Sequence, residues 1–272
     1  FSKESTITVS NADAISVKSD VTINAESAPL HINAGRYAIL AKSNLTINAK
    51  ELDLSVKQDE SVYRGSDTAL IKCSSGKLTI NGDVNGTVES VTNQSSAQGI
   101  KVDGGELTIN GNVTMKKDGG WGISYSKDPA FEPMGIWVSA DSGSAGKVTI
   151  NGLVDMTVNG TALETSAEGT EITVKGGHFT TNKDSDNTNI SIVGMVLTGG
   201  TINLNVNEDK TDAGDAETVL VGDIKLEDSK SHVNFGLSTK DSKWTGVADN
   251  ADGANGTINL YLKNGGTWDN AV

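Results

Sequence analysis

The chain has 272 residues, of which 36% are hydrophobic and only 4% aromatic, and its 35 acidic and 22 basic residues give a formal net charge of -13. This charge repels phosphate backbones and removes the counterion release that drives nucleic-acid binding, so we expect no DNA or RNA partner. Cys73 is the only cysteine, which excludes an intrachain disulfide, and no apolar run reaches the length of a transmembrane helix.

A short motif of alternating apolar residues recurs along the chain. It reads LTING at 78–82 and 107–111 and VTING at 148–152, with looser copies elsewhere. The first apolar residue of each copy, called the marker below, is Val21, Leu45, Leu78, Leu107, Val148, Ile172, Ile202, Val233 or Ile258. The markers are about 30 residues apart on average, and each is followed two positions later by a second apolar residue. A period of two predicts a strand that buries one face.

Two further alternations accompany each copy. One precedes the marker, as in Ile71/Cys73 and Ile100/Val102, and the other follows it, as in 84–88 and 154–158. Copies of the preceding strand are expected at Ile15/Val17, Ile39/Ala41 and Ile136/Val138. Three short strands per period, joined by Gly, Asn, Asp and Ser turns, are typical of one coil of a three-sided solenoid. In this register Cys73 aligns with Val102, which predicts a small buried residue rather than a reactive thiol.

These patterns predict an all-β fold, a right-handed parallel β-helix of about nine coils. We expect 1–272 to form a single domain that ends in the C-terminal coils 233–272. No sustained 3.6-residue apolar stripe supports helices. An antiparallel sandwich would also have short strands, but near-identical copies at a regular offset favour stacked coils.

The longest departure from the repeat is an expected insertion loop at 116–146. It carries four of the aromatic residues. Aromatic side chains gathered on a loop that leaves a plain rod often form a contact site for sugars or proteins. The alternative is that the loop folds back and buries its own rings. The binding-site hypothesis therefore names Trp121, Tyr125, Phe131 and Trp137.

The C-terminal segment carries the most specific motif. Lys243-Trp244-Thr245-Gly246 is followed by Gly-Thr-Ile-Asn-Leu-Tyr-Leu at 256–262 and Asn-Gly-Gly-Thr-Trp at 264–268. This order resembles the W-T-G … N-L-x-L-x-N-G-A-T-W pattern of passenger domains in monomeric bacterial autotransporters, the pertactin-like and Antigen 43-like surface proteins. The resemblance implies an adhesin of a Gram-negative bacterium that is exported through the outer membrane and acts outside the cell. Adhesion, self-association and biofilm formation are the roles it implies.

The partner that the resemblance implies is a second copy of the chain, or a host or bacterial surface protein or glycan. No insertion of this chain into a membrane is expected. Two other functions remain open from the residues: a passive stalk that displays another domain, and a carbohydrate-active β-helix enzyme. A stalk would bind nothing, whereas an enzyme would need convergent carboxylates in a groove.

Candidate catalytic groups are weak in this sequence. Residues 140–144 are similar to the G-D-S-G-S motif of serine protease autotransporters, but they fall in an expected turn and lack a placed His and Asp. The three histidines are far apart, and the acidic clusters occur in polar segments without aromatic neighbours. We therefore expect no catalytic residue, no bound metal and no cofactor. The groups considered are Ser142, His31, His178, His232, Asp184, Asp186, Glu208, Asp209, Asp212, Asp215 and Glu217.

Overall fold

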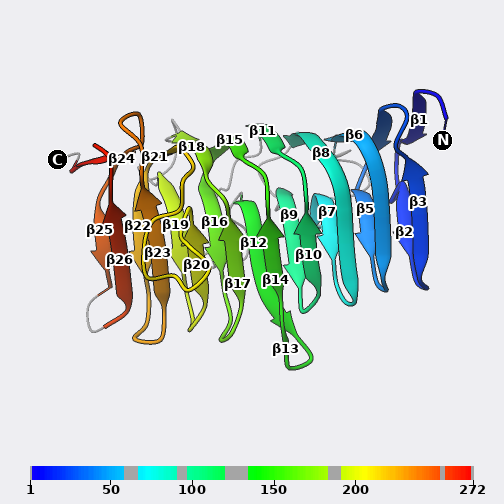
Figure 1. Ribbon diagram of the computed structural model, residues 1–272. Helices are drawn as coiled ribbons and strands as arrows, with labels where there is room; N and C mark the ends of the chain where they lie inside the picture. Colours follow the sequence, from blue (N-terminus) through cyan, green and yellow to red (C-terminus); the bar gives the residue numbers. More distant parts are fainter. Residues whose placement is uncertain are drawn as a thin grey trace.

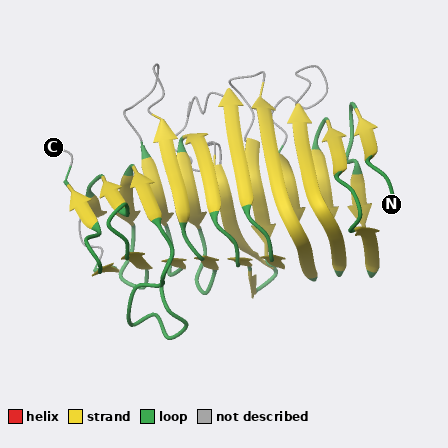
Figure 2. Ribbon diagram, turned by 45° about the horizontal axis from the view of Figure 1, so that its top comes forward, coloured by secondary structure: helices red, strands yellow, loops and turns green. Residues whose placement is uncertain are grey.

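The computed structural model describes residues 2–57, 67–90, 97–119, 134–182, 191–251 and 255–270. Within these ranges every regular element is a strand, and the strands form one 17-stranded and one 10-stranded sheet. The strands lie side by side along an elongated stack, with the two chain termini at opposite ends (Figure 1). Short loops join most of them (Figure 2). The all-β prediction is confirmed.

The marker strands stack on one side of the molecule, called the first face. Each pairs in parallel with the next marker strand along the chain. The first face contains β3 (Val21–Ala25), the first part of β6 (Leu45–Lys57), the first part of β8 (Lys77–Ser90), β10 (Glu106–Ile109), β14 (Lys147–Ile150), β17 (Glu171–Val174), β20 (Thr201–Leu204), β23 (His232–Leu237) and β26 (Thr257–Leu262).

The strands that follow the markers form the second face, continuous with the first because β6 and β8 span both. It contains β1 (Ser5–Val9), β4 (Leu30–Ala34), the later parts of β6 and β8, β11 (Val113–Gly119), β15 (Val154–Asn159), β18 (Gly177–Asn182), β21 (Thr218–Val221), β24 (Lys243–Thr245) and β27 (Thr267–Asp269). All of its neighbouring strands are parallel.

The strands that precede the markers form the third face, which is the separate sheet. It contains β2 (Ile15–Val17), β5 (Tyr37–Ala41), β7 (Thr68–Cys73), β9 (Ala97–Asp103), β12 (Met134–Asp141), β16 (Thr161–Thr165), β19 (Ile192–Val196), β22 (Asp223–Leu226) and β25 (Ala248–Asn250). One short strand, β13 (Ser144–Ala145), pairs antiparallel with β12. The chain visits the three faces in turn, which is consistent with a β-solenoid.

The apolar alternation builds the core between the faces. All nine markers align in one column, and the second apolar residues align in another. In β6, Leu45 and Ile47 are buried while Thr46 between them is partly exposed. Gly99 is needed for the close packing, because a Cβ there would lie 1.9 Å from the Sδ of Met115. The periodicity therefore predicted both the strands and the direction of their side chains.

Cys73 lies in a third-face column between Ala41 and Val102 and is buried. Burial raises the pKa of its thiol to about 11, although nearby backbone groups lower it somewhat. The expected small buried residue is therefore confirmed. We predict that a thiol-specific disulfide reagent modifies the native chain at least about 100-fold more slowly than the urea-unfolded chain at pH 8, because two pKa units change the thiolate population a hundredfold. Equal rates in the two states would contradict this placement.

Candidate functional site

Three of the four predicted aromatic site residues, Trp121, Tyr125 and Phe131, lie outside the described residues. The described ends of the expected insertion loop are regular strands, because β11 continues to Gly119 and β12 begins at Met134. The range 116–146 is thus too wide for a loop. Its fourth aromatic residue, Trp137, lies within β12 on the third face.

Trp137 is half-buried and belongs to an outward column of the third face, where it lies in register between Lys101 and Glu164. The Lys101 Nζ lies 4.0 Å from the centroid of the indole ring, a cation–π contact. The indole Nε1 donates a hydrogen bond of 3.0 Å to the Ser166 Oγ. Both contacts fix the ring against the sheet.

A buried network of charges adjoins Trp137, and we call Tyr37, Asp67, Lys72, Lys101 and Asp103 the third-face cluster. The Asp67 Oδ2 accepts hydrogen bonds from Lys72 Nζ at 2.7 Å, Lys101 Nζ at 2.8 Å and the Tyr37 hydroxyl at 3.1 Å. Asp103 Oδ2 lies 3.4 Å from Lys72 Nζ and 3.8 Å from Lys101 Nζ. The Lys101 side chain is only 10% exposed and that of Lys72 16%.

Asp67 and Lys72 stay charged at neutral pH. Burial alone would raise the pKa of Asp67, but the combined attraction of Lys101 and Lys72 and their hydrogen bonds lower it below its usual range. Burial would likewise lower the pKa of Lys72, and Asp67, together with Tyr37 and Asp103, raises it above its usual value. One carboxylate thus holds two ammonium groups that come from neighbouring strands.

A hollow of about 270 Å³ opens beside the cluster at the N-terminal end of the third face. It is bounded by four cationic side chains and one carboxylate, although the whole chain is strongly acidic. Its lining residues are Asp13, Ser16, Lys18, Arg36, Tyr37, Leu40, Lys42, Lys72 and Ser74.

Three of the candidate catalytic or metal-binding groups, Ser142, His31 and His178, have local partners. Residues 141–144 form the turn between β12 and β13, and the Ser142 hydroxyl donates to the Asp141 carboxylate at 3.1 Å. His31 pairs with Glu4 and Asp53, whereas His178 pairs with Glu217. His232 begins β23 and is exposed. Within the described ranges, no group of three His, Cys, Asp or Glu side chains is placed to hold a metal ion.

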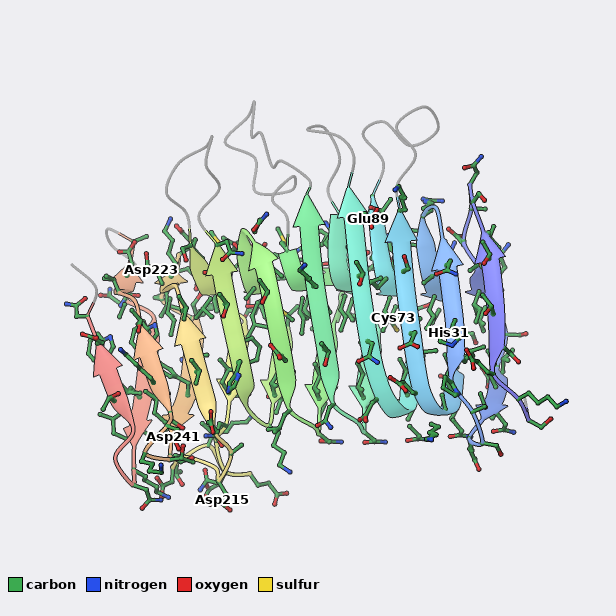
Figure 3. All side chains as sticks on the ribbon, turned by 90° about the horizontal axis from the view of Figure 1, so that it is seen from above. His31, Cys73, Glu89, Asp215, Asp223 and Asp241 are labelled. Atoms are coloured by element: carbon green, nitrogen blue, oxygen red, sulfur yellow. The ribbon has the colours of Figure 1, made fainter. Side chains whose placement is uncertain are left out.

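The larger acidic cluster does not converge on one point. Asp209 accepts hydrogen bonds from Thr211, Asp212 forms an ion pair with Lys263, and Glu217 binds His178. Asp215 lies at one edge of the stack with Asp241, while Asp223 lies at the opposite edge (Figure 3). Glu208 is exposed in the same segment. Asp184 and Asp186 lie outside the described residues.

The C-terminal motif residues have a packing role. Trp244 is buried, stacks on Trp268 with ring centroids 4.9 Å apart, and packs edge-to-face on Phe235 at 5.1 Å. Its Nε1 donates to the Gly222 carbonyl at 2.8 Å. These contacts tie the last strands of the stack together, so the motif is explained by stability without a ligand.

No protein-family model, curated protein or solved structure matches this chain. These comparisons therefore assign the chain to no family, and the resemblance to autotransporter passengers stays a prediction from the sequence. None of the described residues forms a helix capable of crossing a lipid bilayer.

The first face also carries a column of alternating charge that was not predicted from the sequence. The residues that immediately precede four successive markers lie in register in the order Lys77, Glu106, Lys147 and Glu171. Lys77 Nζ and Glu106 Oε2 are 2.9 Å apart, and their side chains are 71% and 48% exposed. The signal was present in the sequence, at the position before each marker, but only the register makes it a column.

Proposed function

We propose that the chain is a right-handed β-helix of about nine coils that serves as an autotransporter passenger, and that it acts at the cell surface as a self-associating adhesin. The single observation that carries this proposal is the column of alternating charge formed by Lys77, Glu106, Lys147 and Glu171. Adhesion between cells and biofilm formation would follow from contacts between identical rods.

The column is complementary to itself in one arrangement. Its members occupy successive parallel strands, which are spaced by roughly 4.8 Å. A two-fold axis perpendicular to the stack reverses the order of the column in the second copy, so that Glu106 faces Lys147. Lys77 then faces Glu171, whose carboxylate Lys210 of the same copy also contacts at 2.8 Å. Two rods in the same direction and at the same height would place like charges together, and a shift by one strand would leave an unpaired charge at each end of the column. The alternation therefore favours antiparallel rods with an isologous interface.

The surface beside the column suits a repeated polar contact. The outward threonines of six marker strands are aligned in register. Next to them runs a ladder in which each asparagine amide donates to the preceding one at 2.6 to 2.7 Å, so the side chains are held in place. Individual exposed contacts contribute little, but a regular array sums many of them. The ladder consists of Asn24, Asn48, Asn81, Asn110 and Asn151.

A charge-swap experiment tests the proposal. We expect the unaltered chain to form a dimer in sedimentation velocity at tens of micromolar and low salt, and the variants Lys77→Glu/Lys147→Glu and Glu106→Lys/Glu171→Lys each to be monomeric. An equimolar mixture of the two variants should dimerise again, because opposite charges then face each other. High salt should weaken all of these dimers.

The matched control is Lys57→Glu/Lys243→Glu, which makes the same charge change on the second face. It should dimerise as the unaltered chain does. A monomeric unaltered chain at all concentrations would overturn self-association and favour a passive stalk. Dimers that survive both swaps would place the interface elsewhere.

A further inference from the structure

We propose that the hollow at the N-terminal end of the third face binds a carboxylated sugar. Three successive strands, β2, β5 and β7, supply its walls. Ser16, Leu40 and Lys72 lie in one register column of these strands. The same three strands end at residues 17, 41 and 73. The residue that comes directly after each end also lines the hollow: Lys18, Lys42 and Ser74. The first face plays no part in this site, so the inference does not depend on self-association.

The cations of the hollow are largely uncommitted. Lys72 is held by Asp67, but the described part of the chain gives no carboxylate partner to Lys18, Lys42 or the Arg36 guanidinium. The guanidinium carbon of Arg36 lies 4.7 Å from the centroid of the Tyr37 ring, a cation–π contact that positions the guanidinium beside the hollow. A planar guanidinium that is pre-positioned in this way binds a carboxylate through two parallel hydrogen bonds.

Two buried polar atoms at the hollow lack hydrogen-bond partners. They are the Nε of Arg36, which is a donor, and the Oδ1 of Asp13, which is an acceptor. Both atoms are closed to solvent, so a ligand in the hollow would meet the remaining polar atoms of the same two side chains, which are donors on Arg36 and an acceptor on Asp13. Inorganic phosphate or sulfate supplies acceptors for Arg36 but is repelled by the Asp13 carboxylate. A sugar acid supplies a carboxylate and hydroxyl donors on one ring.

The size of the hollow agrees with this ligand class. Its volume of about 270 Å³ lies just below the roughly 300–1,000 Å³ range of drug-sized ligand pockets, which suits one sugar ring and not a nucleotide. Ser16 and Ser74 add hydroxyl groups that can bind further sugar hydroxyls, and Leu40 provides an apolar wall for the C–H face of the ring. The carboxylate would lie toward Arg36 and Lys42, with a ring hydroxyl toward Asp13.

The test is isothermal titration calorimetry of the whole chain. The probes are methyl glucuronide, methyl galacturonide and N-acetylneuraminate, with neutral methyl glucoside and inorganic phosphate for comparison. We expect at least one acidic sugar to bind in the micromolar to millimolar range and the neutral sugar not to bind. Arg36→Gln should weaken the affinity for the acidic sugar at least tenfold. Asp13→Asn should weaken the affinity for the acidic sugar but not the affinity for phosphate.

The matched control is Lys175→Gln, which removes an exposed charge from the connection between β17 and β18 and should leave binding unchanged. Circular dichroism and thermal melting establish that each variant is folded. Absence of binding by all three acidic sugars would overturn the proposal, as would binding that is unaffected by Arg36→Gln. Phosphate binding as tight as that of the best sugar would replace the sugar site with a general anion site.

Discussion

Replacing Asp67 by asparagine is expected to lower the free energy of unfolding by about 3 kcal/mol at pH 7. The substitution keeps the size of the side chain but leaves Lys72 and Lys101 without their shared carboxylate, and both ammonium groups are largely buried. Asp103 replaces the lost carboxylate only in part, because its Oδ2 lies 3.4 Å from Lys72 Nζ but 3.8 Å from Lys101 Nζ, beyond hydrogen-bond distance of Lys101. Urea denaturation followed by circular dichroism measures the loss.

The same substitution has a defined dependence on pH. The pKa of Asp67 is lowered in the folded chain, so its carboxylate stabilises the fold above its ordinary pKa, near 4, and this contribution is lost as the pH falls through the folded-state value. The difference between the unaltered chain and Asp67→Asn should therefore be full at pH 7 and should shrink below about pH 4. A difference that stays constant down to pH 2 would contradict the ion-pair explanation.

The control for Asp67 is Glu89→Gln, which breaks an exposed ion pair with Lys57 at 3.0 Å. The two side chains are 50% and 68% exposed, so solvent screens their attraction. We expect a loss of less than about 1 kcal/mol. An equal loss for the two variants would mean that the burial of the third-face cluster has no energetic consequence.

Replacing Ile109 by alanine is expected to cost about 3 kcal/mol of unfolding free energy. Ile109 is fully buried and lies in register between Ile80 and Ile150. The parallel hydrogen-bond ladders on both sides hold the neighbouring strands in place, so the surrounding structure has little freedom to close the cavity. The loss combines the missing hydrophobic burial with the cavity that remains.

Thr108→Ala is the matched control, since it changes the adjacent outward position of the same strand β10. Thr108 is partly exposed, and we expect its replacement to change the unfolding free energy by less than about 1 kcal/mol. Urea denaturation of each variant measures both changes: the midpoint concentration of urea shifts, while the dependence of the unfolding free energy on urea concentration stays the same. Similar effects at positions 108 and 109 would contradict the inward and outward assignment that the alternation predicts.

Much of the fold was predictable because each coil of a solenoid repeats the same short pattern of strands and turns. The spacing of Leu78, Leu107 and Val148 predicted strands that the structure aligns in one column. The alternation within each strand predicted which side chains are buried, since successive residues of a strand point to opposite sides. The range expected for the insertion, 116–146, overlapped the strand expected at Ile136/Val138, and the structure confirms that strand, since Trp137 lies in β12.

The candidate sites were not predictable in the same way, because their residues come together only through stacking. Lys72 and Lys101 occupy equivalent positions of successive repeats. Asp67 binds both, but it lies just before strand β7, outside the repeated pattern. The hollow combines side chains from three successive strands of one face.

The sequence by itself determined that the chain is all-β, that its strands stack in parallel and which residues of each repeat are buried. Each of these depends only on short-range alternation and on a recurring period. The tertiary structure alone decided which charges meet. Lys77 and Glu106 become neighbours, and Arg36 and Asp13 line one hollow, through the register between coils. Contacts between outward side chains depend on the length of each connecting segment, and that length varies from one repeat to the next.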